Sequence, residues 1–118
     1  MNIEEFREYC LKKKGTIETF PFDETTLVFK VMNKMFALTD LEGKFSINLK
    51  CDPELAISLR EQYPSVTSGY HMNKKHWITV IVNGGIEDEI LYKWVDNSYK
   101  LVVDSLPVRL KKSLGEPD

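Results

Sequence analysis

The segment LVFKVMNKMFALT, residues 27–39, decides the fold because it contains two strand-forming runs separated by two residues. Residues 27–31 and 34–39 are rich in aliphatic and aromatic side chains, and Met32-Asn33 has the length of a tight hairpin turn. A second turn at 41–44 leads into FSINLK, residues 45–50, in which apolar and polar residues alternate. Such alternation predicts a strand with one buried face and one face toward solvent or a partner. The polar positions Lys30, Ser46, Asn48 and Lys50 are expected on the open side.

Helix signals flank these strands. Asn2 and Glu5 have the spacing of a capping box, and the apolar residues that follow repeat at helical intervals until Gly15. Residues 52–54, DPE, supply an N-cap, a proline at the first helical position and an acid in the first turn of a second helix. The acidic residues 87–89 mark the first turn of a third helix, because acids favour the positive end of a helix dipole.

The remaining segments complete a mixed α+β pattern. Residues 16–26 lack a clear period and are expected to be irregular, 78–82 alternate as a strand, and 108–114 could form a short basic helix. The order helix, three strands, helix, one or two strands, helix predicts a two-layer fold with a mainly antiparallel sheet and helices on one face. A length of 118 residues with 42% hydrophobic residues fits a single domain over residues 1–118.

Composition limits the class of function. The formal net charge of −2 does not suit a protein that binds polyanions through its bulk charge, so a polyanion site would have to be a local patch. Cys10 and Cys51 form no CxxC pair and sit in apolar patterns, which favours buried thiols in a reducing cytoplasm. No basic start, apolar leader or membrane-length run is present, so we expect a cytoplasmic protein without a membrane partner.

Catalytic and metal-binding motifs are missing from the sequence. There is no phosphate-binding glycine motif, no GxSxG and no cysteine and histidine array at zinc spacing. We therefore expect no enzymatic activity, no cofactor and no metal. The segment SGYHMNKKHW, residues 68–77, instead predicts a polar, cationic loop, with Trp77 in the core. His71 and His76 are five residues apart in this loop, which does not place them on one helix face as a helical metal pair would require.

Five blocks of the sequence resemble the MmcQ/YjbR family. They are PFDETTLVFKV (21–31), KMFAL (34–38), NLKCDPE (48–54), GYHMNKKHW (69–77) and SYKLV (98–102). The resemblance implies a small bacterial α+β protein, similar to frataxin-like and secretion-chaperone-like two-layer domains, with a double-wing DNA-binding motif and no enzymatic activity. The positions that carry the DNA-binding role over to this chain are Lys30, Lys34, Lys50, His71, Asn73, Lys74, Lys75 and His76.

Three hypotheses for function follow. Two loops could act as wings whose lysines neutralise DNA phosphates. Alternatively, the open sheet face or the apolar hairpin 32–36 could receive a protein partner, or a small molecule could bind beside Tyr70, His71 and Trp77. The first hypothesis requires the five lysines to lie together on the surface without carboxylate partners.

Overall fold

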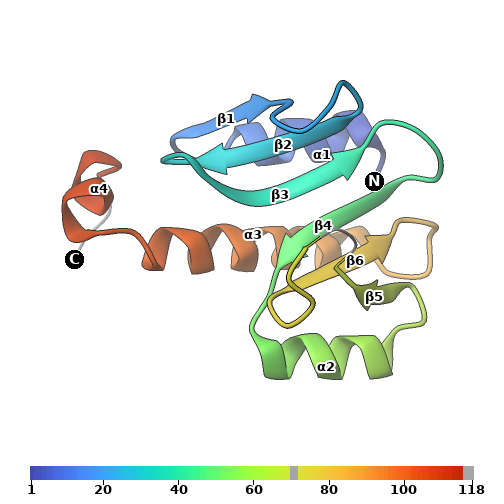
Figure 1. Cartoon of the computed structure of the whole chain (residues 1–118). Helices are drawn as coiled ribbons and strands as arrows, with labels where there is room; N and C mark the ends of the chain where they lie inside the picture. The colour runs from blue at the N-terminus through green and yellow to red at the C-terminus, as the bar shows by residue number, and fades with distance from the viewer. Residues whose placement is uncertain (70–71, 116–118) are drawn as a thin grey trace.

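An antiparallel sheet organises the chain in the computed structural model, which describes residues 1–69 and 72–115 (Figure 1). Six strands form within these residues, and their order across the sheet is β1-β2-β3-β4-β6-β5. The elements in chain order are α1 (Ile3–Leu11), β1 (Thr16–Thr19), β2 (Thr26–Val31), β3 (Lys34–Asp40), β4 (Ser46–Lys50), α2 (Pro53–Gln62), β5 (Val66–Ser68), β6 (Trp77–Ile81), α3 (Asp88–Asp104) and α4 (Val108–Ser113).

The predicted hairpin joins β2 and β3. Met32 and Asn33 both have positive φ, 47° and 69°, which is the conformation that a two-residue hairpin turn of the primed type requires. The pairing register shifts between Phe29 and Lys30, so a bulge precedes the turn. The hairpin that was predicted from the sequence is confirmed.

The sheet is wider than the sequence indicates. Residues 16–26 were expected to be irregular, but Thr16–Thr19 forms the edge strand β1, which pairs with β2 from Thr16↔Val31 to Thr19↔Val28. The three-residue strand β5 forms the opposite edge against β6. Both strands are short and lack hydrophobic alternation, because an edge strand is held mainly by backbone hydrogen bonds to its single neighbour.

The helix termini carry the expected caps. The Asn2 side chain accepts the Glu5 amide proton at 2.8 Å, and the Glu5 carboxylate accepts the Asn2 amide proton at 3.0 Å, which completes the capping box of α1. Asp52 caps α2, where Pro53 takes the first helical position. The basic segment after Pro107 forms the short helix α4.

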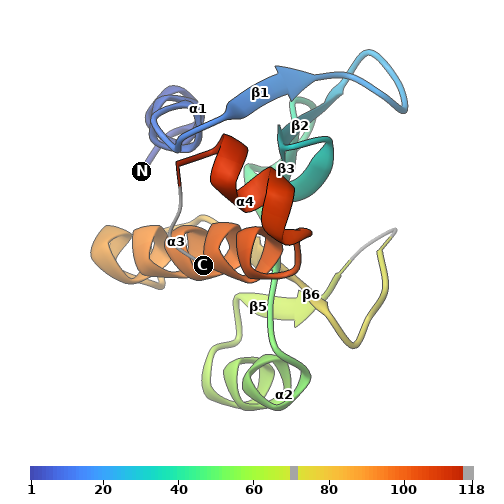
Figure 2. The same ribbon diagram turned by 90° about the vertical axis from the view of Figure 1, so that its left-hand side faces the viewer.

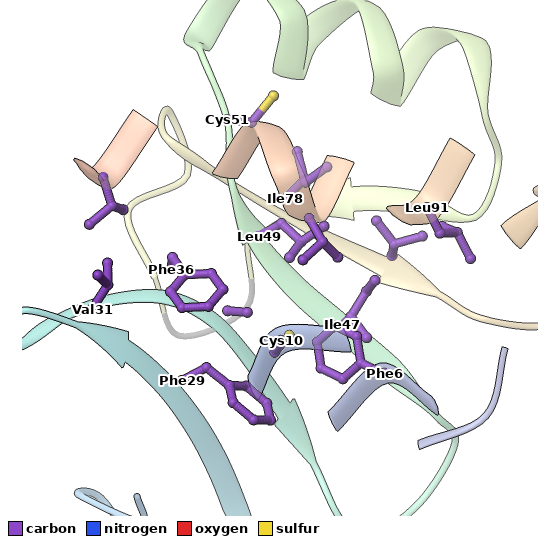
Figure 3. Close-up of a cluster of buried hydrophobic side chains, with 14 of the residues drawn as sticks. Phe6, Cys10, Phe29, Val31, Phe36, Ile47, Leu49, Cys51, Ile78 and Leu91 are labelled. Carbon is purple, nitrogen blue, oxygen red and sulfur yellow. The ribbon is translucent and has the colours of Figure 1, made fainter. Parts of the chain in front are cut away.

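Helices α1, α2 and α3 contribute buried side chains to one hydrophobic core against the sheet. Figure 2 shows α1, α3 and α4 on one side of the sheet, while α2 runs beside the β5 edge. The core contains Phe6 and Cys10 from α1, Ala56 and Leu59 from α2, and Leu91, Val95 and Val102 from α3, with Phe29, Phe36, Ile47, Leu49, Ile78 and Val80 from the sheet (Figure 3). Both thiols are free and buried, as the sequence predicts.

A serine separates β3 from β4 at one end of the sheet. The two strands pair only from Ala37↔Leu49 to Thr39↔Ile47. Beyond that point, the Ser98 hydroxyl of α3 accepts the Lys50 amide proton at 2.9 Å and donates to the Phe36 carbonyl at 2.5 Å. Ser98 is completely buried. Its hydroxyl therefore replaces a direct bond between strands and lets the sheet open where β4 leaves it.

The second face of the sheet, which points away from α1 and α3, is less open than predicted. Asn48 and Thr79 lie side by side on it, and the Asn48 side-chain oxygen accepts the Thr79 hydroxyl proton at 2.6 Å. Asn48 is only 6% exposed. A shallow hollow lined by residues of β2, β3, β4, β5 and β6 and by Glu42 and Lys44 lies here, next to a smaller hollow lined by Phe22 and Met72 from two loops. These loops cover part of the face that the alternating pattern predicts to meet solvent or a partner.

Within residues 1–69 and 72–115, no helix combines the length and the apolar character needed to cross a membrane.

Candidate nucleic-acid interface

The antiparallel topology brings the predicted contact residues to one end of the sheet. Lys34 pairs with Val31 at the β2–β3 turn, and Lys50, the last residue of β4, pairs with Trp77, the first residue of β6. Because β3 and β4 are also antiparallel, the loop before β6 lies at the same end of the strands as the hairpin, and Figure 1 shows it below the hairpin, near the middle of the view. We call this region the lysine end and define it as Lys30, Lys34, Lys50, Asn73, Lys74, Lys75 and His76.

The lysine end extends across several strands. Lys30 is on β2, Lys50 on β4, and Lys75 just before β6, with β3 between the first two. At about 4.8 Å per strand, the backbones of these residues cover at least ~15 Å of sheet width. That width corresponds to roughly four base-pair steps of B-DNA at about 3.4 Å each. The region is wide enough to contact several phosphates.

The five lysines have no carboxylate partners among the described residues. Lys34, Lys74 and Lys75 are exposed, and Lys30 and Lys50 are half-buried. Within residues 1–69 and 72–115, ion pairs join Arg7 and Glu18, Lys13 and Asp96, Lys100 and Asp104, and the N-terminal ammonium and Asp88, and none of them involves these five lysines. The lysine end thus keeps its charge available to an external anion.

The loop before β6 is tied to the sheet at its base. The Gly69 amide donates to the Trp77 carbonyl at 3.0 Å, and the Cys51 amide donates to the His76 carbonyl at 2.7 Å. A side chain at position 69 would bring its Cβ within 2.6 Å of the Trp77 Cβ, so glycine is needed for this close approach. Trp77 is buried as predicted. Its side chain lies on the second face of the sheet, beside Lys50, which is its partner across the β4–β6 pair.

The polar residues of this loop have different roles, because Asn73 stabilises a turn and His76 is exposed. The Asn73 side-chain oxygen accepts the Lys75 amide proton at 2.9 Å, and the Asn73 carbonyl accepts the His76 amide proton at 3.2 Å. Asn73 therefore shapes the turn that holds Lys74 and Lys75, while its amide NH₂ group has no hydrogen-bond partner among the described residues. His76 is exposed. Tyr70 and His71 lie outside the described residues.

Acidic side chains gather at the other end of the molecule. Burial raises the pKa of the Tyr92 hydroxyl, and the negative charges of Glu5, Asp88 and Glu8 raise it further, so the starts of α1 and α3 lie together there. Asp40, the last residue of β3, and Glu42, in the β3–β4 loop, are also at the end of the sheet opposite the hairpin. Several acids therefore lie away from the lysine end, while Asp52 and Glu54, at the start of α2, closely follow Lys50 in sequence.

A cation outside the predicted set lies beside the loop lysines. Arg60, in the last turn of α2, lines a hollow of about 420 Å³ together with Pro53, Ile57, Ser68, Lys74 and Lys75. In the sequence, Arg60 is indistinguishable from a residue that complements the helix dipole. Only the return of the chain through β5 places it next to residues fourteen and fifteen positions later.

Two further expectations can be compared with the structure. Phe36, in the hairpin proposed to receive a protein partner, is completely buried and packs edge-on against Tyr99, with ring centroids 5.2 Å apart. It is therefore not a surface contact. The described residues contain no group of three or more histidine, cysteine or acidic side chains that could hold a metal ion.

The fold and the site together define a class: an α+β protein with a six-stranded antiparallel sheet, helices packed on one face, and a basic end formed by strand termini. The YjbR family model matches residues 11–101. The chain belongs to the YjbR family.

Relatives in sequence and in structure agree with this assignment. The chain is 36% identical over 115 residues to the uncharacterized protein YjbR of Escherichia coli (strain K12), covering 97% of this chain and 98% of that protein. It is 43% identical over 94 residues to the uncharacterized protein YbdF of Escherichia coli O157:H7, covering 79% and 77% of the two chains.

Two solved structures have the same fold. The crystal structure of Deinococcus radiodurans protein DR2400 superimposes with a TM-score of 0.91 at 41% identity and covers 99% of this chain and 90% of that chain. A crystal structure of a Pseudomonas syringae protein gives a TM-score of 0.73 at 32% identity and covers 86% of this chain and 98% of that chain.

Proposed function

We propose that this protein binds duplex DNA through the lysine end. The observation that carries the proposal is the gathering of five lysines at one end of the sheet without carboxylate partners among the described residues. In this arrangement, the β2–β3 hairpin and the 72–76 loop act as two wings on either side of the β4 terminus. No catalytic role is assigned to any residue.

The two wings have different contacts to offer. The lysine ammonium groups neutralise phosphates and set the position of the protein, while base contacts in a groove would supply sequence preference. The NH₂ group of Asn73 and the ring of exposed His76 are the groups placed to reach base edges. With up to five lysine contacts, the slope of log K against log salt should have a magnitude of about 4.5.

A salt-dependent titration tests this proposal. Fluorescence anisotropy of a labelled duplex is measured at 50 mM and 200 mM salt with the native protein and with Lys74→Glu/Lys75→Glu. Five phosphate contacts predict roughly a 500-fold weakening between the two salt concentrations. The double substitution should weaken binding at least ten-fold at the lower concentration, because it replaces two attractions by two repulsions.

The matched control is Lys44→Glu/Lys93→Glu. It changes the net charge by the same amount, but Lys44 is in the β3–β4 loop, at the opposite end of the sheet, and Lys93 is on the exposed surface of α3. Equal losses in the two variants would show that only total charge matters and would refute a site at the lysine end. Absence of binding by the native protein at 50 mM salt would refute DNA binding itself.

A further inference from the structure

The hollow between α2 and the loop before β6 concentrates positive charge around a small volume. Its lining residues are Pro53, Ile57, Arg60, Ser68, Lys74 and Lys75. Three of the six are cations and none is an acid. The volume of about 420 Å³ accommodates a phosphate group with part of the molecule that carries it.

Arg60 supplies a donor that has no partner in the protein. Its Nη1 atom is buried and has no hydrogen-bond partner among the described residues. A buried charged donor left unpaired destabilises the folded state unless an anion satisfies it. A guanidinium presents parallel N–H groups that match two oxygens of a phosphate.

The surroundings of Arg60 leave its charge largely unbalanced. Burial and the charge of Asp52 raise the pKa of the Cys51 thiol, and Arg60 opposes them, which places the guanidinium close to Cys51. Glu61 is adjacent to Arg60 in sequence, and the side chain of Asp52 accepts the Leu55 amide proton at the start of α2. No carboxylate forms an ion pair with Arg60, Lys74 or Lys75 within residues 1–69 and 72–115.

We propose that this hollow is a binding site for a phosphate monoester, held by Arg60 at its inner wall and by Lys74 and Lys75 at its rim. The Ser68 hydroxyl, which also lines the hollow, is the neutral donor to the same group. Three cations favour the dianionic monoester over a singly charged phosphodiester or carboxylate. The proposal goes beyond duplex binding, because a monoester occurs at a nucleic-acid 5′ end and on small phosphorylated molecules alike.

Calorimetric titration with inorganic phosphate tests the site directly. Native protein at pH 7.5 should bind phosphate, with heat that sodium chloride at equal ionic strength does not produce. Arg60→Gln, which keeps a hydrogen-bond donor but removes the charge, should weaken phosphate binding at least ten-fold. Arg109→Gln, at an exposed position on α4, should leave it unchanged.

A second variant distinguishes loss of phosphate binding from loss of the fold. Lys74→Gln/Lys75→Gln alters only exposed side chains and should weaken phosphate binding at least five-fold in a protein with an unchanged circular dichroism spectrum. The proposal is overturned if phosphate produces no more heat than chloride, or if both the Arg60 and the lysine variants bind phosphate like the Arg109 control.

A comparison of ligands separates this proposal from DNA binding. Two duplexes that differ only in a 5′-phosphate or a 5′-hydroxyl are titrated beside a nucleoside 5′-monophosphate. Tighter binding of the 5′-phosphorylated duplex, lost in Arg60→Gln, supports a nucleic-acid terminus as the source, whereas monophosphate binding without duplex binding supports a small molecule and refutes the proposed function alone. Duplex binding without any response to phosphate or monophosphate overturns the monoester site and leaves the proposed function standing.

Discussion

At the scale of single residues, Ser98 has a structural role that no sequence pattern reveals. Replacing it with alanine would leave the Lys50 N–H and the Phe36 C=O without their shared hydroxyl. Each buried polar group that loses its partner costs about 1–3 kcal/mol. We expect Ser98→Ala to lower the free energy of unfolding by about 2–4 kcal/mol, measured by urea denaturation.

The control for this prediction is another serine. Ser58 is exposed on α2 and makes no side-chain hydrogen bond within the described residues. Ser58→Ala should change stability by less than about 0.5 kcal/mol. Similar effects at both positions would mean that strands β3 and β4 do not depend on the bridge.

The raised pKa of the Cys51 thiol makes the stability of the folded protein depend on pH in the alkaline range. Burial raises its pKa to about 11, with Asp52 adding to the shift and Arg60 opposing it. The thiol of an unfolded chain has a pKa of about 8.5. Between about pH 8.5 and about pH 11, Cys51 therefore loses its proton in the unfolded state but keeps it in the folded state. The contribution of Cys51 is therefore complete below about pH 8.5 and declines as pH rises toward the folded-state pKa.

We expect the urea midpoint of the native protein to fall between pH 8 and pH 10.5. Cys51→Ala should show a smaller fall, because its remaining decline comes from the Cys10 thiol, whose pKa burial raises strongly, and from Tyr9, whose pKa burial and the Asp96 carboxylate raise to about 12. Identical declines in both proteins would contradict a role for Cys51. Burial should also make the native thiol unreactive toward a disulfide reagent at pH 8 until the protein is denatured.

At the scale of elements, the β2–β3 turn gives a direct test of backbone conformation. Asn33 has a φ of 69°, and its side chain is exposed. A β-branched residue in that conformation costs about 1–2 kcal/mol, whereas glycine adopts it without strain. Asn33→Val should lower thermal stability accordingly, and Asn33→Gly should stay within a few tenths of a kcal/mol of the native protein. Equal thermal midpoints for the two variants would contradict the turn conformation.

Helices and strands with strong local sequence signals could be predicted, whereas edge strands that form only by pairing with a neighbouring strand could not. The capping box at Asn2 and Glu5, the proline start of α2 and the 27–39 hairpin each depend on residues close in sequence, and each is confirmed. β1 and β5 have three or four residues each and form because β2 and β6 offer a free edge. Asn48 was predicted on the correct face, but the alternating pattern could not show that this face is partly covered.

At the scale of the whole molecule, charge separation predicts behaviour that net charge does not. Despite its formal net charge of −2, the protein should be retained on heparin at pH 7 and low salt through the lysine end. It should also bind an anion exchanger through the acidic end. Lys74→Glu/Lys75→Glu should elute from heparin at lower salt than Lys44→Glu/Lys93→Glu. Passage of the native protein through heparin without delay would contradict a separated basic surface.

The same scale explains why the candidate site was only partly predictable. The lysines could be named from the sequence, but their common location depends on the antiparallel register that joins the ends of β2, β4 and β6. Arg60 could not be assigned at all, because its neighbours are set by the packing of α2 beside β5 and the loop that follows. Long-range topology, rather than composition, creates the site.

A molecule with opposite charges at its two ends experiences a torque in a non-uniform electric field as well as a net force. Near any polyanion, rotation would turn the hairpin and the 72–76 loop inward before the first contact forms. Fewer encounters would then be lost to wrong orientations, even though the overall sign of the protein opposes approach. The separation of the α1 and α3 starts from the β2–β3 turn would therefore govern the speed of association more than its final strength.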